Sequence, residues 1–268
     1  MSFDLPSLRS FAEDLARLAG TEALAGRRSL GTGTGRTLDH DTKSTPTDPV
    51  TEYDRAAERL IVDAIRARRP DDAIVGEEGA DHPGTSGLEW HIDPIDGTAN
   101  FVYDLPSWCT SVAVVDTDGP LAGAVYIPVT DELFSAARGH GATLDHASIA
   151  CSTVTELSQA LVGTGFSYSA ELRAGQARRL DRLLPEVRDV RRLGSAAIDL
   201  CFVACGRLDA YFEEYLNSWD LAAGVLIAQE AGATTSDLHG GPPGSVATVA
   251  AAPRIHQALV TRINVIDS

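Results

Sequence analysis

The chain has 268 residues, enough to bury one large core or two closely fused ones. Its 22 basic and 38 acidic side chains give a formal net charge of −16. This charge argues against general nucleic-acid binding, because such proteins need basic surface to displace counterions. The chain shows no apolar run of membrane-spanning length and no signal-peptide pattern. We therefore expect a cytoplasmic protein with no membrane partner.

The first half of the chain is predicted to combine helices with a group of strands. Apolar periodicity predicts helices over residues 4–27 and 51–69. Between them, the run Gly31-Thr32-Gly33-Thr34-Gly35 indicates a mobile loop or hairpin rather than a nucleotide-binding loop. A short strand is predicted at residues 73–76. Further strands, with hairpins typical of an antiparallel sheet, are predicted at residues 88–92, 109–115, 119–127 and 132–138.

After about residue 150 the chain is predicted to alternate between strand and helix. The strands are predicted at residues 161–163, 187–190, 210–212 and 246–251. The helices are predicted at residues 170–184, 195–205, 220–231 and 253–263. This alternation favours layered α/β packing. We expect two subdomains that share an interface, residues 1–145 and residues 146–268.

The run Asp93-Pro94-Ile95-Asp96-Gly97-Thr98 is the segment most indicative of chemistry. Pro94 favours a turn that lets Asp93 and Asp96 face one point. Gly97 lets backbone N–H groups approach an anion, and Thr98 adds a hydroxyl. Hard divalent cations prefer oxygen ligands, and a phosphate prefers cations together with N–H donors. The run therefore predicts a metal-assisted phosphate site, where bound cations would offset the acidity of the protein.

Four further features could serve the same site. Glu77 follows a predicted strand, and Asp54 lies early in the second predicted helix, downstream of the only lysine, Lys43. Asp220 begins a helix, where it could also be a simple cap. The small residues Gly194-Ser195-Ala196 begin another helix and would allow a ligand to approach free N–H groups. Taken singly, each feature has an ordinary structural explanation.

Together these blocks resemble the inositol monophosphatase family of magnesium-dependent, lithium-sensitive phosphatases. The likeness is carried by residues 43–54, Gly76-Glu77-Glu78, the run from Asp93 to Phe101, and Trp219-Asp220 with Glu230-Ala231-Gly232, which follow the family order. The resemblance implies the five-layer α-β-α-β-α sandwich of the inositol monophosphatase and fructose-1,6-bisphosphatase superfamily, usually a homodimer. Residues 1–145 would form an α+β subdomain whose antiparallel sheet carries most metal ligands. Residues 146–268 would form an α/β subdomain that contributes Asp220 and the substrate-binding residues.

The resemblance also implies two to three Mg²⁺ ions. Glu77, Asp93 and the carbonyl of Ile95 would bind the first ion. Asp93, Asp96 and Asp220 would bind the second, and a weaker third would share Glu77. Removal of one bridging carboxylate is expected to slow turnover roughly a thousandfold or more.

Other family positions concern the attacking water and the substrate. Thr98 and Asp54 would orient and deprotonate the water. The N–H groups of Gly97 and Thr98 would hold the phosphate, with Lys43 close by. The positions expected to contact the substrate hydroxyls are Gly194, Ser195, Ala196, Glu213 and Asp220.

The function implied is hydrolysis of an inositol monophosphate by direct attack of water. The D-x-x-D-G-T spacing excludes a haloacid-dehalogenase-type phosphatase, which needs D-x-D-G-T. Glu213 favours a phosphorylated polyol as substrate. Histidinol phosphate and fructose 1,6-bisphosphate stay open as alternatives, as does a relative with an added regulatory binding role.

Overall fold

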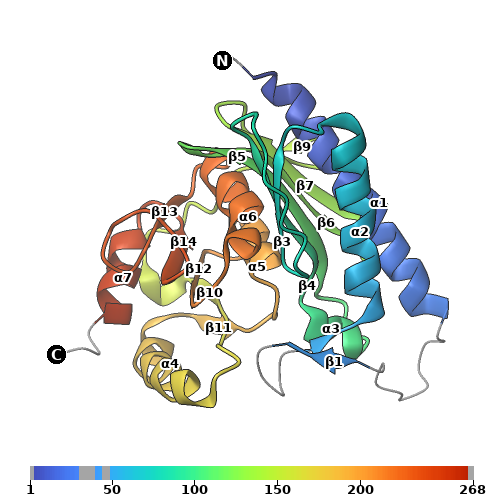
Figure 1. Ribbon diagram of the computed structural model, residues 1–268. Coiled ribbons are helices and arrows are strands. Elements are labelled where there is room, and N and C mark those ends of the chain that lie inside the picture. The colour runs from blue at the N-terminus through green and yellow to red at the C-terminus, as the bar shows by residue number, and fades with distance from the viewer. Residues whose placement is uncertain (1–2, 30–39, 44–48, 265–268) are drawn as a thin grey trace.

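The computed structural model describes residues 3–29, 40–43 and 49–264, which form two sheets separated and covered by helices (Figure 1). The glycine-rich run at residues 31–35 lies outside the described residues. All six predicted helices are observed within three residues of their predicted bounds, whereas the short helix at residues 98–102 was not predicted. The described α-helices are α1 (Leu5–Ser29), α2 (Glu52–Arg68), α3 (Thr98–Val102), α4 (Ala170–Leu183), α5 (Ala196–Ala204), α6 (Ser218–Glu230) and α7 (His256–Asn264).

The larger sheet has seven strands in sequence order, and only its first pair, β3 and β4, is parallel. This arrangement confirms the predicted antiparallel sheet. Its strands are β3 (Ala73–Gly76), β4 (Glu89–Asp96), β5 (Cys109–Asp116), β6 (Gly119–Ile127), β7 (Glu132–Ala137), β8 (Ala142–Leu144) and β9 (Ala147–Ser148).

The smaller sheet has the order β11-β10-β12-β14-β13. β10 is parallel to both of its neighbours, whereas β14 is antiparallel to both of its own. Its strands are β10 (Leu161–Thr164), β11 (Asp189–Arg191), β12 (Ala210–Glu214), β13 (Thr234–Ser236) and β14 (Ala247–Ala251). A separate short pair joins β1 (Asp41–Thr42) to β2 (Pro49–Val50).

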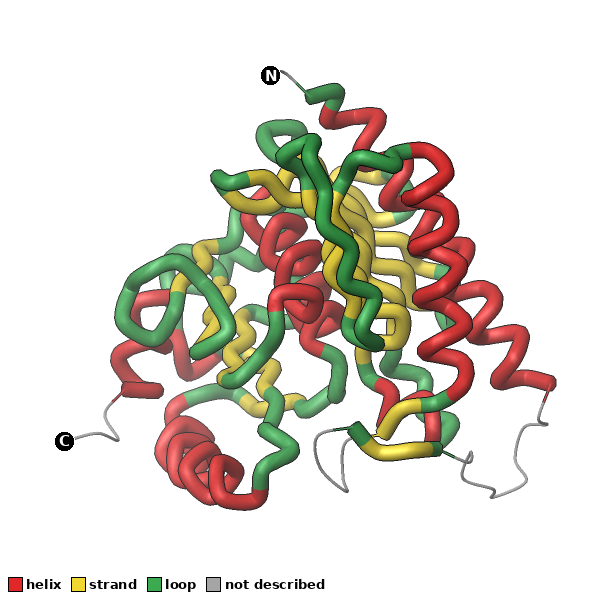
Figure 2. The backbone as a smooth tube through the Cα atoms, viewed as in Figure 1, coloured by secondary structure: helices red, strands yellow, loops and turns green. Residues whose placement is uncertain are grey.

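The layers alternate between helix and sheet, as Figures 1 and 2 show. α1 and α2 cover one face of the larger sheet, α5 and α6 lie between the two sheets, and α4 and α7 cover the smaller sheet. The five-layer sandwich is therefore confirmed. No helix in the described part of the chain is long and apolar enough to cross a membrane.

Burial explains the layers. α1 buries one face only, with Leu8, Phe11 and Leu15 at helical spacing against the larger sheet. In α6 every residue from Leu221 to Ala228 is buried, because sheets lie on both sides of the helix. Thr51 caps α2 by accepting hydrogen bonds from the backbone N–H groups of Tyr53 and Asp54.

The hairpin near residue 145 completes the larger sheet. Asp145 and His146 both have positive φ, which suits the two-residue turn between β8 and β9. The predicted boundary at residue 145 thus falls inside this hairpin, and the core between the sheets takes side chains from both sides of it, such as Phe134 and Leu200. The division into two subdomains stays a prediction.

Candidate metal and substrate site

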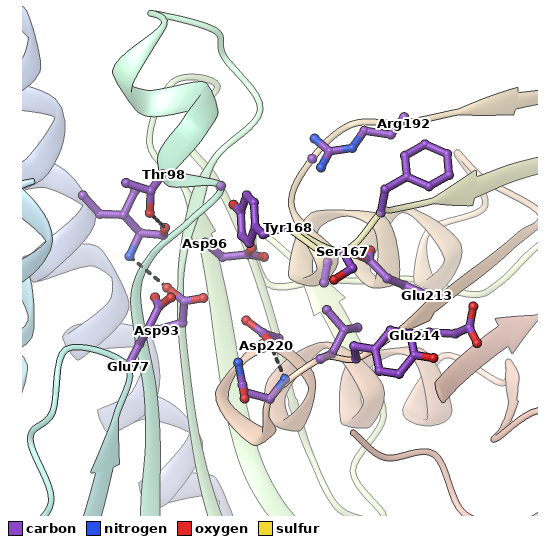
Figure 3. Close-up of a pocket in the computed structure, with 18 of the residues that line it drawn as sticks. Glu77, Asp93, Asp96, Thr98, Ser167, Tyr168, Arg192, Glu213, Glu214 and Asp220 are labelled. Carbon is purple, nitrogen blue, oxygen red and sulfur yellow. Dashed lines mark hydrogen bonds between the residues drawn. The ribbon is translucent and has the colours of Figure 1, made fainter. Parts of the chain in front are cut away.

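The two aspartates of the D-x-x-D run face the same side of the sheet because β4 contains a bulge. Asp93 pairs with Ser111 of β5 and Asp96 with Cys109, so three steps along β4 match two along β5. Without the extra residue, side chains three positions apart would point to opposite faces. The Asp93 carboxylate also accepts a hydrogen bond from the backbone N–H of Ile95, at 3.1 Å. Together these features direct both carboxylates into one pocket (Figure 3).

Asp220 completes a cluster of three carboxylates. One oxygen from each of Asp93, Asp96 and Asp220 lies within 4.8 Å of the other two. Asp220 is the third residue of α6 and accepts a hydrogen bond of 2.6 Å from the N–H of Asn217. Burial, together with the neighbouring carboxylates, raises the pKa of Asp93 and of Asp220 well above the usual value. Crowded buried carboxylates of this kind suit a hard divalent cation.

Asp96 is fixed from behind by the start of α5. Its Oδ2 accepts hydrogen bonds of 2.7 Å from Ser195 Oγ and from the N–H of Ala197. Burial raises the pKa of Asp96 to about 6, although these hydrogen bonds oppose the shift. Ser195 Oγ also accepts from the N–H of Ile198, so this buried hydroxyl supports Asp96 and caps α5. The neighbouring positions predicted for substrate contact, Gly194 and Ala196, line the pocket.

Glu77 lies beside this cluster at the end of β3. Its Oε1 is 2.8 Å from the ammonium of Lys43, whereas its Oε2 is buried and has no hydrogen-bond partner among the described residues. Burial opposes the charge on Lys43, but the ion pairs with Glu77 and Glu78 outweigh it and raise the pKa of the lysine. An unpartnered buried carboxylate oxygen next to three further carboxylates fits Mg²⁺, which prefers oxygen ligands.

The turn that carries Glu77 is held by a buried acid that the sequence analysis missed. Glu58 of α2 accepts hydrogen bonds from the backbone N–H groups of Glu78, at 2.8 Å, and Ala80, at 3.2 Å. A Cβ at position 76 would overlap the Glu58 carboxylate, so Gly76 allows this close approach. Burial raises the pKa of Glu58 to about 7.

Thr98 and Asp54 form the pair expected from the family resemblance. Thr98 Oγ1 lies 3.0 Å from both Asp54 Oδ1 and the carbonyl oxygen of Ile95, and its single proton can go to either. Asp54 is fully buried behind Thr98, and its other oxygen accepts from the N–H of Thr51. Burial raises the pKa of Asp54 above its usual value. Gly97, with φ of 97°, makes the turn into α3.

The opposite side of the pocket comes from loops around the smaller sheet. The cavity has a volume of about 310 Å³, and ten of the predicted site residues line it. The other three predicted site residues, Lys43, Asp54 and Ser195, do not line it. Glu213 of β12 faces it and accepts a hydrogen bond of 2.7 Å from the Tyr211 hydroxyl; burial raises the pKa of Glu213 to about 7. The sequence analysis missed the lining residues Phe166, Ser167, Tyr168, Ser169, Arg192, Glu214, Tyr215, Leu216 and Asn217.

Comparison with known proteins places this geometry in context. A model of the inositol monophosphatase family matches residues 4–266. An inositol-1-monophosphatase of Mycobacterium leprae is 46% identical over 279 residues, which cover 97% of this chain and 94% of that protein. A protein of Pasteurella multocida described as Nus factor SuhB is 41% identical, over 81% of this chain and 82% of its own length.

Solved structures show the same likeness. The structure of Mycobacterium tuberculosis SuhB superimposes with a TM-score of 0.83 and 41% sequence identity. The match covers 99% of this chain and the whole of that one. The whole layered architecture is therefore shared, including the elements that carry the acidic cluster.

Proposed function

The chain belongs to the inositol monophosphatase family, and from this premise we propose that it is a magnesium-dependent phosphomonoesterase that hydrolyses inositol monophosphate. The observation that carries the proposal is the pairing of two chemistries in one pocket. Asp93, Asp96, Asp220 and Glu77 gather at one end, and Glu213 faces the other. Metal ions and phosphate suit the first end, and the hydroxyl groups of a polyol suit the carboxylate of Glu213.

The family resemblance and the carboxylate cluster together support the following ligands. Glu77, Asp93 and the Ile95 carbonyl would hold one, and Asp93, Asp96 and Asp220 a second; a third would share Glu77. When bound, Mg²⁺ neutralises the phosphate, lowers the pKa of water and stabilises the leaving alkoxide. Lys43 adds a positive charge beside Glu77, at the phosphate end of the pocket.

The chain's own groups would position and deprotonate the attacking water. Thr98 Oγ1 would accept a proton from the water while passing its own proton to Asp54 Oδ1, 3.0 Å away. The raised pKa of Asp54 makes it a better proton acceptor near neutral pH. The water oxygen bonds to phosphorus as the ester P–O bond breaks, and the leaving alcohol oxygen takes a proton from solvent. The N–H groups of Gly97 and Thr98 would hold the phosphate during this step.

A panel of phosphate esters tests the proposal. We expect the purified chain with saturating Mg²⁺ to release phosphate from inositol 1-phosphate with higher kcat/KM than from histidinol phosphate or fructose 1,6-bisphosphate. Millimolar Li⁺ should inhibit the reaction by replacing the second Mg²⁺. If no ester releases phosphate, the proposal fails; if histidinol phosphate is much the better substrate, the assigned alcohol is wrong.

A regulatory role is the second candidate, because the relative from Pasteurella multocida is described as a Nus factor. The two roles separate in a variant that keeps the fold but lacks phosphatase activity, such as Asp96→Asn. If cells carrying this variant in place of the wild-type chain keep the wild-type phenotype, that phenotype depends on a role of the chain other than hydrolysis.

Family resemblance further leads us to propose a cytoplasmic homodimer. Sedimentation of the purified chain would test whether it is a dimer.

A further inference from the structure

One basic side chain lines the pocket among several acidic side chains. Six acidic residues line the cavity, namely Glu77, Asp93, Asp96, Glu213, Glu214 and Asp220. Arg192 is the only basic residue among the described residues that line it. In Figure 3 it lies across the pocket from Glu77 and Asp93, above Ser167 and Glu213. Its charge is therefore on the side where the alcohol part of the substrate would lie.

The guanidinium of Arg192 has no hydrogen-bond or ion-pair partner within the described part of the chain, and the side chain lines the pocket. The absence of a side chain at Gly194 leaves space for the guanidinium. Gly194 has φ of 93°, and a Cβ there would overlap Nη1 of Arg192. A larger residue at position 194 would thus displace the guanidinium.

Glu213 faces Arg192 without pairing with it. Burial raises the pKa of Glu213 and of the buried Asp199, and the positive charge of Arg192 opposes both shifts, so the three groups interact electrostatically. Their charged atoms are nevertheless too far apart for an ion pair, and the Tyr211 hydroxyl holds the Glu213 carboxylate at 2.7 Å. A hydrogen-bond acceptor and a guanidinium with open donors thus face the same space.

We propose that Arg192 forms a subsite for a second anionic group, a phosphate or a carboxylate, on the alcohol part of the substrate. This inference rests on the proposed phosphatase function and extends its substrate class beyond inositol monophosphate to esters that carry a second anion. Glu213 accepts a hydrogen bond from a substrate hydroxyl, while Arg192 binds the second anion through two parallel N–H donors. Esters that lack the second anion are still hydrolysed, because the carboxylate cluster binds the phosphate that is removed.

Two matched pairs of substrates test the proposal, each differing in one anion. Fructose 1,6-bisphosphate is compared with fructose 1-phosphate for the phosphate case. For the carboxylate case, 6-phosphogluconate is compared with glucitol 6-phosphate. The variants are Arg192→Gln and the control Arg191→Gln. Arg191 is the exposed neighbour, pairs with Asp189 at 2.6 Å and does not line the cavity, so its substitution removes the same charge from outside the pocket.

The wild-type chain should prefer the more anionic member of at least one pair by about 10- to 100-fold in kcat/KM, as expected for hydrogen bonds to a charged group. Arg192→Gln should abolish that preference while changing kcat/KM for the less anionic member less than about threefold, and Arg191→Gln should keep the preference. The pair that shows the preference identifies phosphate or carboxylate as the ligand group.

Three results would overturn the subsite. They are the absence of a preference in the wild type, a preference that survives Arg192→Gln, and an equal loss on both members of a pair, which would place Arg192 on the phosphate that is removed. Thermal unfolding of both variants checks that they fold. The lack of phosphate release from every ester, inositol 1-phosphate included, would instead reject the proposed function itself.

Discussion

The two ends of the pocket are built from different kinds of structure. At the metal end, Asp93 and Asp96 lie on β4, the second strand of the larger sheet, and Asp220 lies in the first turn of a buried helix. Hydrogen bonds from backbone N–H groups fix all three. At the alcohol end, Tyr168, Arg192 and Tyr215 lie on connecting segments, and all three are exposed. We therefore expect the regular elements to fix the hydrolytic chemistry, and the connecting segments, together with Glu213 of β12, to select the alcohol.

The largest expected effect tests the rigid end. Asp96→Asn should lower kcat roughly a thousandfold or more, because it removes a charged ligand while keeping the shape of the side chain. In metal-free buffer its melting temperature should stay unchanged or rise, because one of several close carboxylates loses its charge. Phosphate release and thermal unfolding measure the two effects. Asp118→Asn, in an exposed turn, is the control, and normal turnover by Asp96→Asn would refute the ligand role.

A smaller effect is expected at the water-activating pair. Thr98→Ala should lower kcat about 100-fold, as for the loss of a proton-transfer group, and leave KM nearly unchanged. Thr98→Ser keeps the hydroxyl 3.0 Å from Asp54 and should retain most activity. Steady-state kinetics of both variants measure these changes in kcat and KM. Equal activities of the alanine and serine variants would show that the hydroxyl is not used.

A smaller effect on metal binding is expected from Glu58, which supports the turn that carries Glu77. Glu58→Gln replaces one acceptor oxygen by an NH₂ group, so only one of the two N–H groups of the Glu77 turn keeps its partner. Mg²⁺ should then bind roughly 10-fold more weakly, as for other losses of support behind a ligand. The Mg²⁺ concentration for half-maximal activity reports this change. Asp63→Asn, exposed on the same helix, should leave it unaltered.

The smallest effect concerns stability and pH. The pKa of Asp96 is raised from 3.8 to about 6. Between these two pH values the folded chain therefore binds more protons at Asp96 than the unfolded chain does. The free energy of unfolding contributed by Asp96 should therefore fall as pH rises from about 4 to 6 in metal-free buffer. Urea unfolding at pH 5.0 and 7.5 in EDTA should show a larger loss for wild type than for Asp96→Asn. Identical losses would show that the pKa of Asp96 is not raised in the folded chain.

Sequence patterns predicted the rigid end better than the loops, for physical reasons. Residues 51–69 and 88–92 have periodically spaced apolar residues, which is local information, and α2 and β4 form there. The β4 bulge and the short helix α3 depend on pairing with β5 and on the conformation of Gly97, which periodicity does not report. β14 is antiparallel in a sheet expected from strand–helix alternation, because the order of strands depends on contacts far apart in sequence.

The candidate site follows the same division. The carboxylates and Thr98 lie together as the motif predicted, because they are carried by regular elements. Ser195 shows what a motif leaves out, since its small side chain supports Asp96 rather than lining the cavity. Arg192 lies two residues before the Gly194-Ser195-Ala196 segment, but only the folded loop shows that its side chain turns toward the pocket.

The most direct test of the central claim is the Mg²⁺ dependence of phosphate release from inositol 1-phosphate by the EDTA-treated wild-type chain. The carboxylate cluster predicts no release without Mg²⁺, and an activation curve steeper than a single-site curve because more than one ion is needed. Full activity in EDTA would contradict the claim that these carboxylates act by holding metal ions.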